Sequence, residues 1–124
     1  MKRVLIVDDE DAIRKSVAIA LRHHGCEVVL APDGQRCLEE MRRGFAGIVL
    51  MDIMMPGLNG WETIRALVRE NLLQNALVCM LTAKSSPGPE SEGIEEFIFD
   101  YLPKPFDYAS LIHCVDNATG YLPS

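Results

Sequence analysis

Residues 47–60 read GIVLMDIMMPGLNG, a stretch that combines a strand, a polar tip and a turn. Its first five residues include four large apolar side chains, which is typical of a strand that is buried on both faces. Asp52 follows directly, and Pro56, Gly57 and Gly60 mark the turn after it. A carboxylate at the tip of a buried strand is unfavourable for stability, so its presence there favours a functional role.

Apolar runs and amphipathic stretches alternate along the rest of the chain. The apolar runs predict strands over residues 3–7, 26–31, 47–51, 76–81 and 98–102. The amphipathic stretches predict helices over about 9–24, 32–43, 60–70 and 107–119, with Asp9, Asn59 and Asp107 as helix caps. Between the fourth and fifth strands the sequence allows only a short helix, over roughly 89–96.

This alternation predicts a parallel sheet with helices on both faces, joined by right-handed crossovers. For five strands the common doubly wound order is 2-1-3-4-5, as in flavodoxin-like folds. The order reverses between the first and third strands, and such sheets bind ligands outside the carboxyl ends of their strands at that reversal. We therefore expect an α/β fold of five parallel strands and five helices, with a site at this edge.

Polar side chains follow four of the five expected strands at this edge. Asp8 and Asp9 follow the first strand, Asp52 the third, Thr82 the fourth and Lys104 the fifth. Neighbouring carboxylates repel one another unless a cation neutralises them, and carboxylate oxygens with water suit Mg²⁺. Thr82 adds a hydroxyl donor, and Lys104, between two prolines, adds a positive charge. This combination favours a site for a phosphoryl group over one for a hydride or an acyl group.

Each of these residues also has a simpler explanation when it is taken singly. Asp9 alone would be a helix cap, Thr82 a turn residue and Lys104 a solvated cation. It is their coincidence at one edge of the sheet that favours a functional site.

Four motifs hold these residues: VDDE at 7–10, LMDIMMPGLNG at 50–60, LTA at 81–83 and YLPKPF at 101–106. With them, the chain resembles the receiver domain of two-component response regulators along essentially its whole length, and chemotaxis regulators in particular. The resemblance implies a signalling switch that accepts a phosphoryl group from a histidine kinase. Such a switch is no enzyme for other substrates, because it catalyses only its own phosphorylation and dephosphorylation.

The resemblance also implies the roles of the acidic residues. Asp52 would attack the phosphoryl group of the kinase's phosphohistidine and form an aspartyl phosphate. Asp9 would bind Mg²⁺ directly and Asp8 largely through water. Asp52 and the backbone carbonyl of Met54 would complete the protein ligands.

The remaining motif residues would bind the phosphoryl group and report its presence. By resemblance, Lys104 pairs with one phosphoryl oxygen, and the Thr82 hydroxyl and the backbone N–H of Ala83 hold the others. The Lys104–Pro105 bond is expected to be cis. In the family, phosphorylation draws the threonine inward and an aromatic residue turns from exposed to buried, which makes Tyr101 the expected switch. A static, half-buried tyrosine is the alternative.

The sequence departs from the family pattern in two places. Residues 97–101 read FIFDY where many receiver domains have GADDY, so the glycine that ends the fourth helix is missing. With two prolines and two glycines between 87 and 93, that helix is expected to be short or mobile, and 85–101 to form an unusual partner surface. Met54 and Lys84 occupy positions that modulate hydrolysis of the aspartyl phosphate. Since Met54 offers no hydrogen bond to an attacking water, we expect slow self-dephosphorylation.

Composition argues against several other classes of function. The 124 residues carry a net charge of −6 and no basic patch, which argues against direct binding of nucleic acid. Without a membrane-spanning apolar run or a signal peptide, a cytoplasmic protein is expected. The four cysteines lack C-x-x-C spacing, so reduced, buried thiols are expected in place of a disulfide framework or a zinc site.

Two other functions use similar features. A phosphatase of the haloacid-dehalogenase type also uses an aspartate and Mg²⁺, but it needs a second acid where Met54 stands, and a cap domain. An interaction module with the same fold that is never phosphorylated is the other alternative. Such modules usually lose one of the five site residues, and none is lost here.

We expect residues 1–124 to form a single receiver domain without an output domain. The expected partners are a sensor histidine kinase or a phosphotransfer protein, and a downstream effector that binds the face of the fourth helix, fifth strand and fifth helix. The effector is either a separate protein or a domain of a longer parent chain. A phosphorylation-dependent dimer is a further alternative, and no partner is expected to be nucleic acid or membrane.

Overall fold

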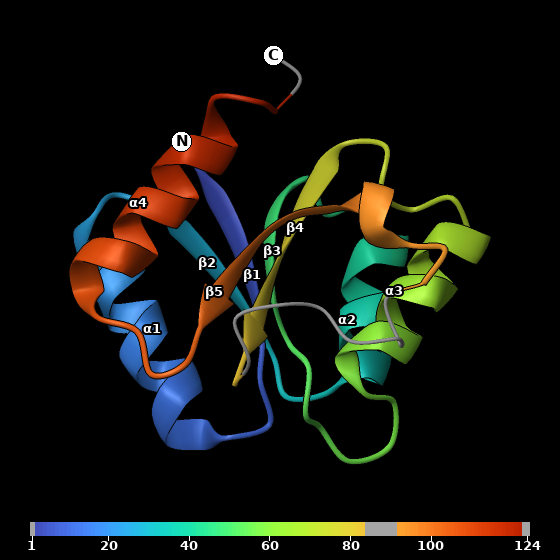
Figure 1. Cartoon of the computed structure of the whole chain (residues 1–124). Coiled ribbons are helices and arrows are strands. Elements are labelled where there is room, and N and C mark those ends of the chain that lie inside the picture. Colours follow the sequence, from blue (N-terminus) through green and yellow to red (C-terminus); the bar gives the residue numbers. More distant parts are fainter. Residues whose placement is uncertain (1, 84–91, 123–124) are drawn as a thin grey trace.

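Five parallel strands form one sheet in the order β2-β1-β3-β4-β5, as the sequence predicts (Figure 1). The structure is a computed structural model that describes residues 2–83 and 92–122. Each strand is close to its expected range, and three of them extend one residue further at their carboxyl ends, into the polar tip. The strands are β1 (Arg3–Val7), β2 (Glu27–Ala31), β3 (Gly47–Asp52), β4 (Ala76–Thr82) and β5 (Ile98–Pro103).

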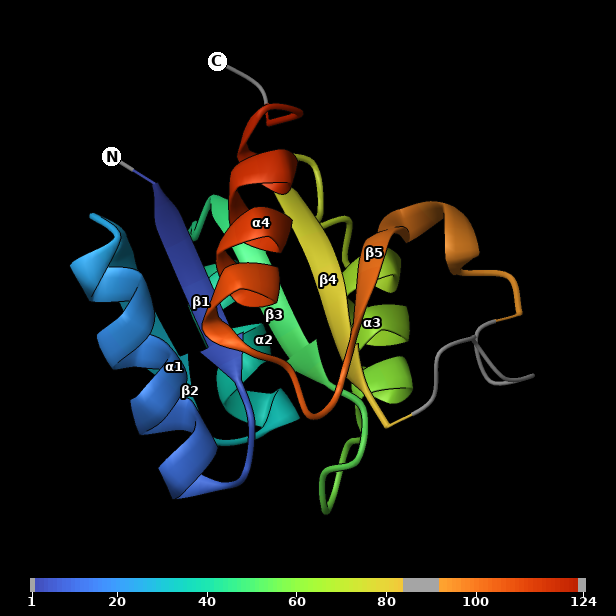
Figure 2. The same ribbon diagram turned by 60° about the vertical axis from the view of Figure 1, so that its left-hand side comes forward.

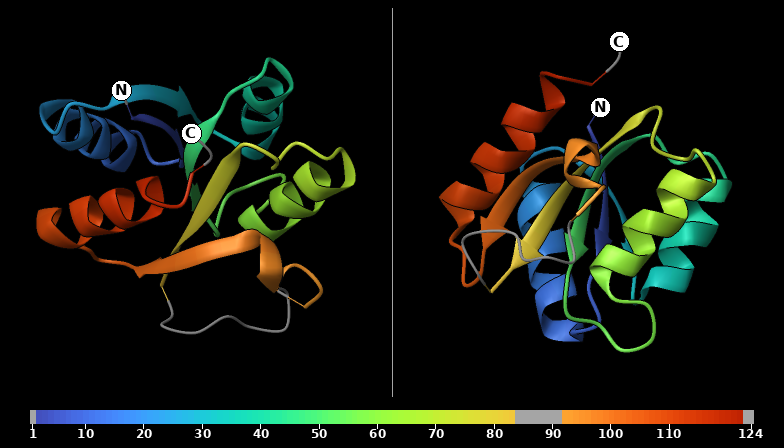
Figure 3. Two further views of the ribbon diagram at one scale, coloured as in Figure 1. Left: turned by 90° about the horizontal axis from the view of Figure 1, so that it is seen from above. Right: turned by 45° about the vertical axis from the view of Figure 1, so that its right-hand side comes forward.

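Four α-helices cover the two faces of the sheet, two on each face (Figure 3). The last of them, expected as the fifth helix, carries the label α4. Side-chain caps start three of the helices, because the carboxylates of Asp33 and Asp107 and the amide oxygen of Asn59 each accept a hydrogen bond from a backbone N–H three residues later. The helices are α1 (Asp11–His23), α2 (Gly34–Arg42), α3 (Gly60–Arg69) and α4 (Tyr108–Thr119).

The strands divide their side chains between two apolar cores. Alternate residues of β3 illustrate this, since Val49 and Met51 belong to the core under α2 and α3, whereas Ile48 and Leu50 belong to the core under α1 and α4. Every residue of β3 is buried, which agrees with the continuous apolar run that predicted a central strand. Because all five strands are parallel, their carboxyl ends lie at one edge of the sheet, the lower edge in Figure 1.

The described residues contain four of the five predicted helices as α-helices, and the predicted short helix over roughly 89–96 lies partly outside them. Between β4 and β5 they contain a short 3-10 helix, η2 (Glu95–Phe97), preceded by Gly93 with a φ of +84°. A left-handed glycine interrupts helical hydrogen bonding, so η2 does not continue through Gly93. Residues 84–91, which include most of the segment predicted to be short or mobile, lie outside the described residues. The face predicted to bind an effector is thus described as η2, β5 and α4 (Figure 2).

The prediction that Asp9 caps the first helix is wrong. Helix α1 begins at Asp11, with Glu10 at its N-cap and no side-chain cap. The backbone N–H of Glu10 donates instead to Oδ1 of Asp8, at 2.9 Å. The carboxylate of Asp9 lies with the other acidic residues at the edge of the sheet, so the residue serves that cluster and does not cap the helix.

Candidate functional site

Three carboxylates meet at the carboxyl edge of the sheet. Asp8, Asp9 and Asp52 each offer one oxygen, and these oxygens all lie within 4.8 Å of one another. Asp8 is fully buried, Asp52 is 4% exposed and Asp9 is exposed. Within residues 2–83 and 92–122 this is the single group of three or more His, Cys, Asp or Glu side chains close enough to hold a metal ion. The predicted juxtaposition of these aspartates is confirmed.

Strand pairing and one glycine position Asp52. Val7 of β1 pairs with Met51 of β3, so Asp8 and Asp52 follow paired residues and emerge side by side. After β3 the chain folds back, and the N–H of Gly60 donates to the carbonyl of Ile53 at 2.8 Å. A Cβ at residue 60 would lie 2.5 Å from the carbonyl oxygen of Asp52, so a glycine is needed for this close approach.

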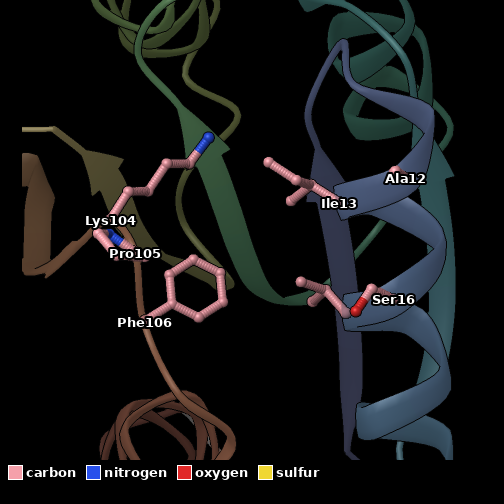
Figure 4. A pocket seen from close by; sticks show the side chains of 7 residues that line it. Ala12, Ile13, Ser16, Lys104, Pro105 and Phe106 are labelled. Atoms are coloured by element: carbon pink, nitrogen blue, oxygen red, sulfur yellow. The ribbon is translucent and has the colours of Figure 1, made fainter.

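Lys104 lies between two of the carboxylates. Its Nζ donates to Oδ2 of Asp8 at 3.2 Å and to Oδ1 of Asp52 at 3.1 Å. Figure 4 shows the side chain reaching from the loop after β5 toward the tip of β3. The backbone N–H of Lys104 donates to the carbonyl of Thr82 at 2.6 Å, which joins the ends of β4 and β5. The Lys104–Pro105 bond is cis, as the family resemblance predicted.

The charges of this cluster do not balance. One ammonium group faces three carboxylates, so two negative charges remain when all of these groups are ionised. Burial raises the pKa of Asp52 to about 6, and repulsion from Asp8 adds to this, although the hydrogen bond from Lys104 opposes it. Burial lowers the pKa of Lys104, but its contacts with Asp52 and Asp8 outweigh burial and raise it. A divalent cation carries the charge that would neutralise the cluster.

Thr82 and Tyr101 lie on the same face of the sheet, the face covered by α2 and α3. Thr82 is buried at the end of β4, where it pairs with Pro103 of β5. Tyr101 pairs with Met80, two residues before Thr82, and packs half-buried against the core under α2 and α3. Their predicted roles in a switch therefore involve neighbouring positions on two paired strands.

Two further predicted residues line the edge of the site. Ala83 directly follows β4 and is exposed. Met54 lies two residues after Asp52, in the loop before α3, and its side chain is 77% exposed. A position this open leaves Met54 beside the solvent from which a hydrolytic water would come. Lys84, which was singled out with it, lies outside the described residues.

Sequence reasoning missed two residues that support the site. Nη1 of Arg14 donates to the carbonyl of Asp8 at 2.7 Å, and the same guanidinium pairs with Asp11. Gly60 was read as a turn residue only, although it packs directly against the backbone of Asp52. Its place in the LMDIMMPGLNG motif was the available signal, whereas no local pattern distinguishes Arg14 from an ordinary helix-surface arginine.

A cavity of about 450 Å³ lies beside Lys104, between α1 and the loop after β5. Figure 4 shows the ring of Phe106 facing Ile13 and Ser16 of α1 across it. Its walls are mostly apolar, and Lys104 lies at its margin toward the carboxylates. The sequence did not predict this cavity, because it forms between two groups of side chains that are at least 87 positions apart. Its lining residues are Ala12, Ile13, Ser16, Val17, Lys104, Pro105 and Phe106.

Comparison with known protein families identifies the chain. Residues 4–116 match the family model described as "Response regulator receiver domain". The chain belongs to this family. Among curated proteins, the receiver domain is 32% identical over 111 residues to the phosphate regulon transcriptional regulatory protein PhoB of Escherichia coli (strain K12), covering 90% of this chain and 48% of PhoB. It is 36% identical over 112 residues to the sensory transduction protein RegX3 of Mycolicibacterium smegmatis, again covering 90% of this chain and 48% of the relative.

Solved structures with the same fold cover nearly the whole receiver domain. A CheY-like response regulator receiver domain protein from Methanospirillum hungatei is 40% identical, with a TM-score of 0.92 and coverage of 97% of this chain and 95% of that one. The response regulator TrrA from Thermotoga maritima, solved in complex with Mg²⁺–BeF, is 30% identical, with a TM-score of 0.81 and coverage of 95% and 99%. The receiver domain thus has the expected flavodoxin-like, chemotaxis-regulator-like fold.

The receiver domain spans about half the length of the curated relatives that it matches. Within the described residues, no helix is long and apolar enough to cross a membrane. All four cysteines are free and buried, as predicted, so these thiols form no disulfide.

Proposed function

We propose that this receiver domain accepts a phosphoryl group on Asp52 from a histidine kinase or a phosphotransfer protein. The observation that carries the proposal is the position of Lys104, whose Nζ lies 3.1 Å from Asp52 and 3.2 Å from Asp8, with the carboxylate of Asp9 close by. Phosphoryl transfer depends mainly on alignment and charge neutralisation, and this cluster supplies a carboxylate nucleophile beside a fixed cation.

The residues present fit a Mg²⁺ ion. Their oxygens are the ligands that Mg²⁺ prefers, and the two excess negative charges match its charge. We infer that Asp8, Asp9, Asp52 and the backbone carbonyl of Met54 hold it, with Asp9 bound directly and Asp8 largely through water. When bound, the ion neutralises phosphoryl oxygens and helps to orient the transferred group. The similar regulator TrrA was solved with Mg²⁺–BeF, which supports this assignment.

The protein residues then divide the work of transfer. Asp52, with a pKa of about 6, is ionised at neutral pH, so one carboxylate oxygen can attack phosphorus while the bond to the donor nitrogen breaks. Lys104 pairs with one phosphoryl oxygen, and the Thr82 hydroxyl and Ala83 N–H donate to the others. The chain acts in this way only on itself, as a signalling switch without a further substrate.

Phosphorylation of the site changes the conformation of the face formed by η2, β5 and α4. A phosphoryl group adds negative charge and strong acceptors at Thr82, and a shift of Thr82 changes the space available to Tyr101 on the same face of the sheet. We propose that the downstream effector binds this face. It is a separate protein or a domain of a longer parent chain, and the greater length of the similar transcriptional regulatory protein PhoB supports the second of these. Pairing of two copies through this face is the dimer alternative.

We propose that residues 1–124 act as one receiver domain in the cytoplasm, where a histidine kinase presents its phosphohistidine. The acidic net charge of −6 supports a protein partner over nucleic acid.

Intact-mass spectrometry after incubation with a phosphoramidate, with and without Mg²⁺, tests the proposed function. We expect the wild type to gain one phosphoryl group only with Mg²⁺, and Asp52→Asn to gain none. Asp100→Asn is a matched control, because Asp100 is an exposed aspartate on β5, which β4 separates from the strand of Asp52. Absence of an adduct with every small donor would overturn the proposal and leave an interaction module, whereas an adduct on Asp52→Asn would show that the acceptor is another residue.

A further inference from the structure

Two aromatic rings from different elements meet beside the proposed switch. Trp61 lies in the first turn of α3 and is 6% exposed, and Tyr101 lies half-buried on β5. Their ring centroids are 6.5 Å apart, with an angle of 50° between the ring planes. Tilted rings at this separation attract one another beyond the effect of burial alone. Figure 2 shows β5, the edge strand, at the same side of the molecule as α3.

The backbone ties Trp61 to the phosphoryl site. Its neighbour Gly60 donates to the carbonyl of Ile53, the residue after Asp52, and lies too close to the Asp52 carbonyl to carry a Cβ. The Asn59 side chain caps α3 in a reciprocal capping box with Glu62, which sets the direction of this first turn. A shift of the end of β3, which carries Asp52, therefore moves the base of the Trp61 side chain.

The same core also contains the strand residues of the switch. Met80 of β4 pairs with Tyr101, and its Cε would lie 3.1 Å from a Cβ at Gly60. Met80, Trp61 and Tyr101 all belong to the core under α2 and α3. The Tyr101 side chain thus lies beside β4, which ends at Thr82, and beside α3, which begins after the loop that follows Asp52.

We propose that Trp61 is a positioning residue that holds Tyr101 in its resting orientation and couples it to the end of β3 at Asp52. The inference rests on the proposed function, because it concerns how occupancy of that site reaches β5. In the resting orientation the two rings are in contact, and movement of Tyr101 toward Thr82 gives up that contact. The Trp61 ring accordingly opposes the switch, and its removal favours the occupied state.

Affinity for beryllium fluoride in the presence of Mg²⁺ measures this opposition. Beryllium fluoride on a carboxylate imitates a phosphoryl group, and ¹⁹F NMR counts the bound form without relying on protein fluorescence. We expect Trp61→Leu to bind it about two- to tenfold more tightly than the wild type, the range that corresponds to a single aromatic pair. Trp61→Phe, which keeps a ring, should lie between the two.

A double-mutant cycle separates positioning from a general structural effect. If Trp61 acts through Tyr101, Trp61→Leu should have no further effect on affinity in a Tyr101→Leu background. Phe99→Leu is the matched control, because Phe99 lies on β5 with its ring against Tyr121, in the opposite core. An equal effect of Trp61→Leu with and without Tyr101, or weaker binding by Trp61→Leu, would overturn the inference.

Intrinsic fluorescence provides a second readout, since Trp61 is the single tryptophan of the chain. We expect its emission to change when beryllium fluoride binds to the wild type and to Phe99→Leu, and to change much less in Tyr101→Leu. If no variant binds beryllium fluoride by ¹⁹F NMR, the proposed function fails. If all bind but the emission change is the same without Tyr101, only the coupling fails.

Discussion

The two ends of the sheet carry similar charged side chains in opposite circumstances. At the amino end, Asp116 of α4 pairs with Lys2 and with His24, whose Nε2 lies 2.9 Å from its carboxylate. These side chains stay 29–43% exposed, and the Lys2 hydrogen bond, with that of His24, lowers the pKa of Asp116. Exposed pairs of this kind contribute little to stability, about 0–1 kcal/mol each.

At the carboxyl end, the charged side chains are buried, and their charges are only partly paired. Asp8 and Asp52 are almost fully buried, and they depend on one lysine while Asp9 adds a third carboxylate. Here the pKa of Asp52 is raised, which is the opposite of the shift at Asp116. The charges at the amino end are therefore paired, whereas the carboxyl end keeps an excess of negative charge that a bound cation would balance.

The largest difference between the ends should follow from removal of their lysines. Lys104→Met leaves two buried carboxylates without their cation, so we expect the metal-free protein to lose about 3–5 kcal/mol of unfolding free energy at pH 7.5. Lys2→Met removes an exposed pair and should cost about 1 kcal/mol or less. Urea unfolding of both variants measures the contrast, and equal losses would show that the ends are alike.

Removal of an aspartate should act with opposite signs at the two ends. The charge on Asp52 opposes folding, so Asp52→Asn should raise the metal-free unfolding free energy at pH 7.5 by about 1–3 kcal/mol. Asp116→Asn removes a carboxylate that favours folding and should lower stability slightly. Thermal and urea unfolding check the signs, and a destabilised Asp52→Asn would contradict the idea of excess charge.

The pH dependence of these variants follows from the same pKa shifts. Because the folded pKa of Asp52 is raised from 3.8 to about 6, its contribution is fully present below 3.8 and is lost as the pH rises through 6. The advantage of Asp52→Asn over the wild type should therefore shrink by about 1 kcal/mol between pH 7.5 and 5. The Asp116 contribution is present above 3.8 and is lost as the pH falls through its lower folded pKa, so Asp116→Asn should show no such change in this window.

Protons and Mg²⁺ should compete at the carboxyl end. A metal ligand has to be deprotonated, so with a pKa of about 6 for Asp52 we expect Mg²⁺ affinity to be about tenfold weaker at pH 5 than at pH 7.5. Asp52→Asn, which has no proton to displace at that position, should show a smaller change. Calorimetric titration at the two pH values measures the affinities. A pH-independent affinity would show that Asp52 is not a ligand of the ion.

The smallest expected effect concerns the lifetime of the phosphoryl group. Met54→Asn places a hydrogen-bonding side chain beside the site, where it can orient water, so we expect aspartyl phosphate to hydrolyse a few times faster, equivalent to about 1 kcal/mol or less in the barrier. Ile19→Asn, at another exposed apolar position but on α1, should change nothing. Decay of the phosphorylated mass after donor removal gives the rate, and a wild-type lifetime of seconds would contradict slow self-dephosphorylation.

Most residues of the site at the carboxyl end could be predicted, because the sequence shows where each strand ends. Apolar runs of five or six residues marked the strands, and the doubly wound order then brought Asp8, Asp52, Thr82 and Lys104 to one edge. What failed was local. A cap at Asp9 was plausible from propensity, but the carboxylate of Asp9 lies with the acidic cluster. Of the expected short helix before β5, the described residues show the three-residue 3-10 helix η2.

Contacts between distant side chains could not be predicted in the same way. The pairing of Lys104 with both Asp8 and Asp52 joins side chains at the ends of three different strands. The ring contact of Trp61 with Tyr101 joins residues 40 positions apart, and no hydrophobic periodicity in the sequence predicts it. These contacts come from tertiary packing, and local sequence patterns record only one partner at a time.

Calorimetric titration with Mg²⁺ at pH 7.5 tests most directly whether the carboxyl end of the sheet binds a divalent cation. We expect the wild type and Asp116→Asn to bind one Mg²⁺ with the same affinity, and Asp8→Asn and Asp52→Asn to bind it at least about tenfold more weakly. Unchanged affinity in both of these carboxyl-end variants, or no Mg²⁺ binding by the wild type, would contradict the account.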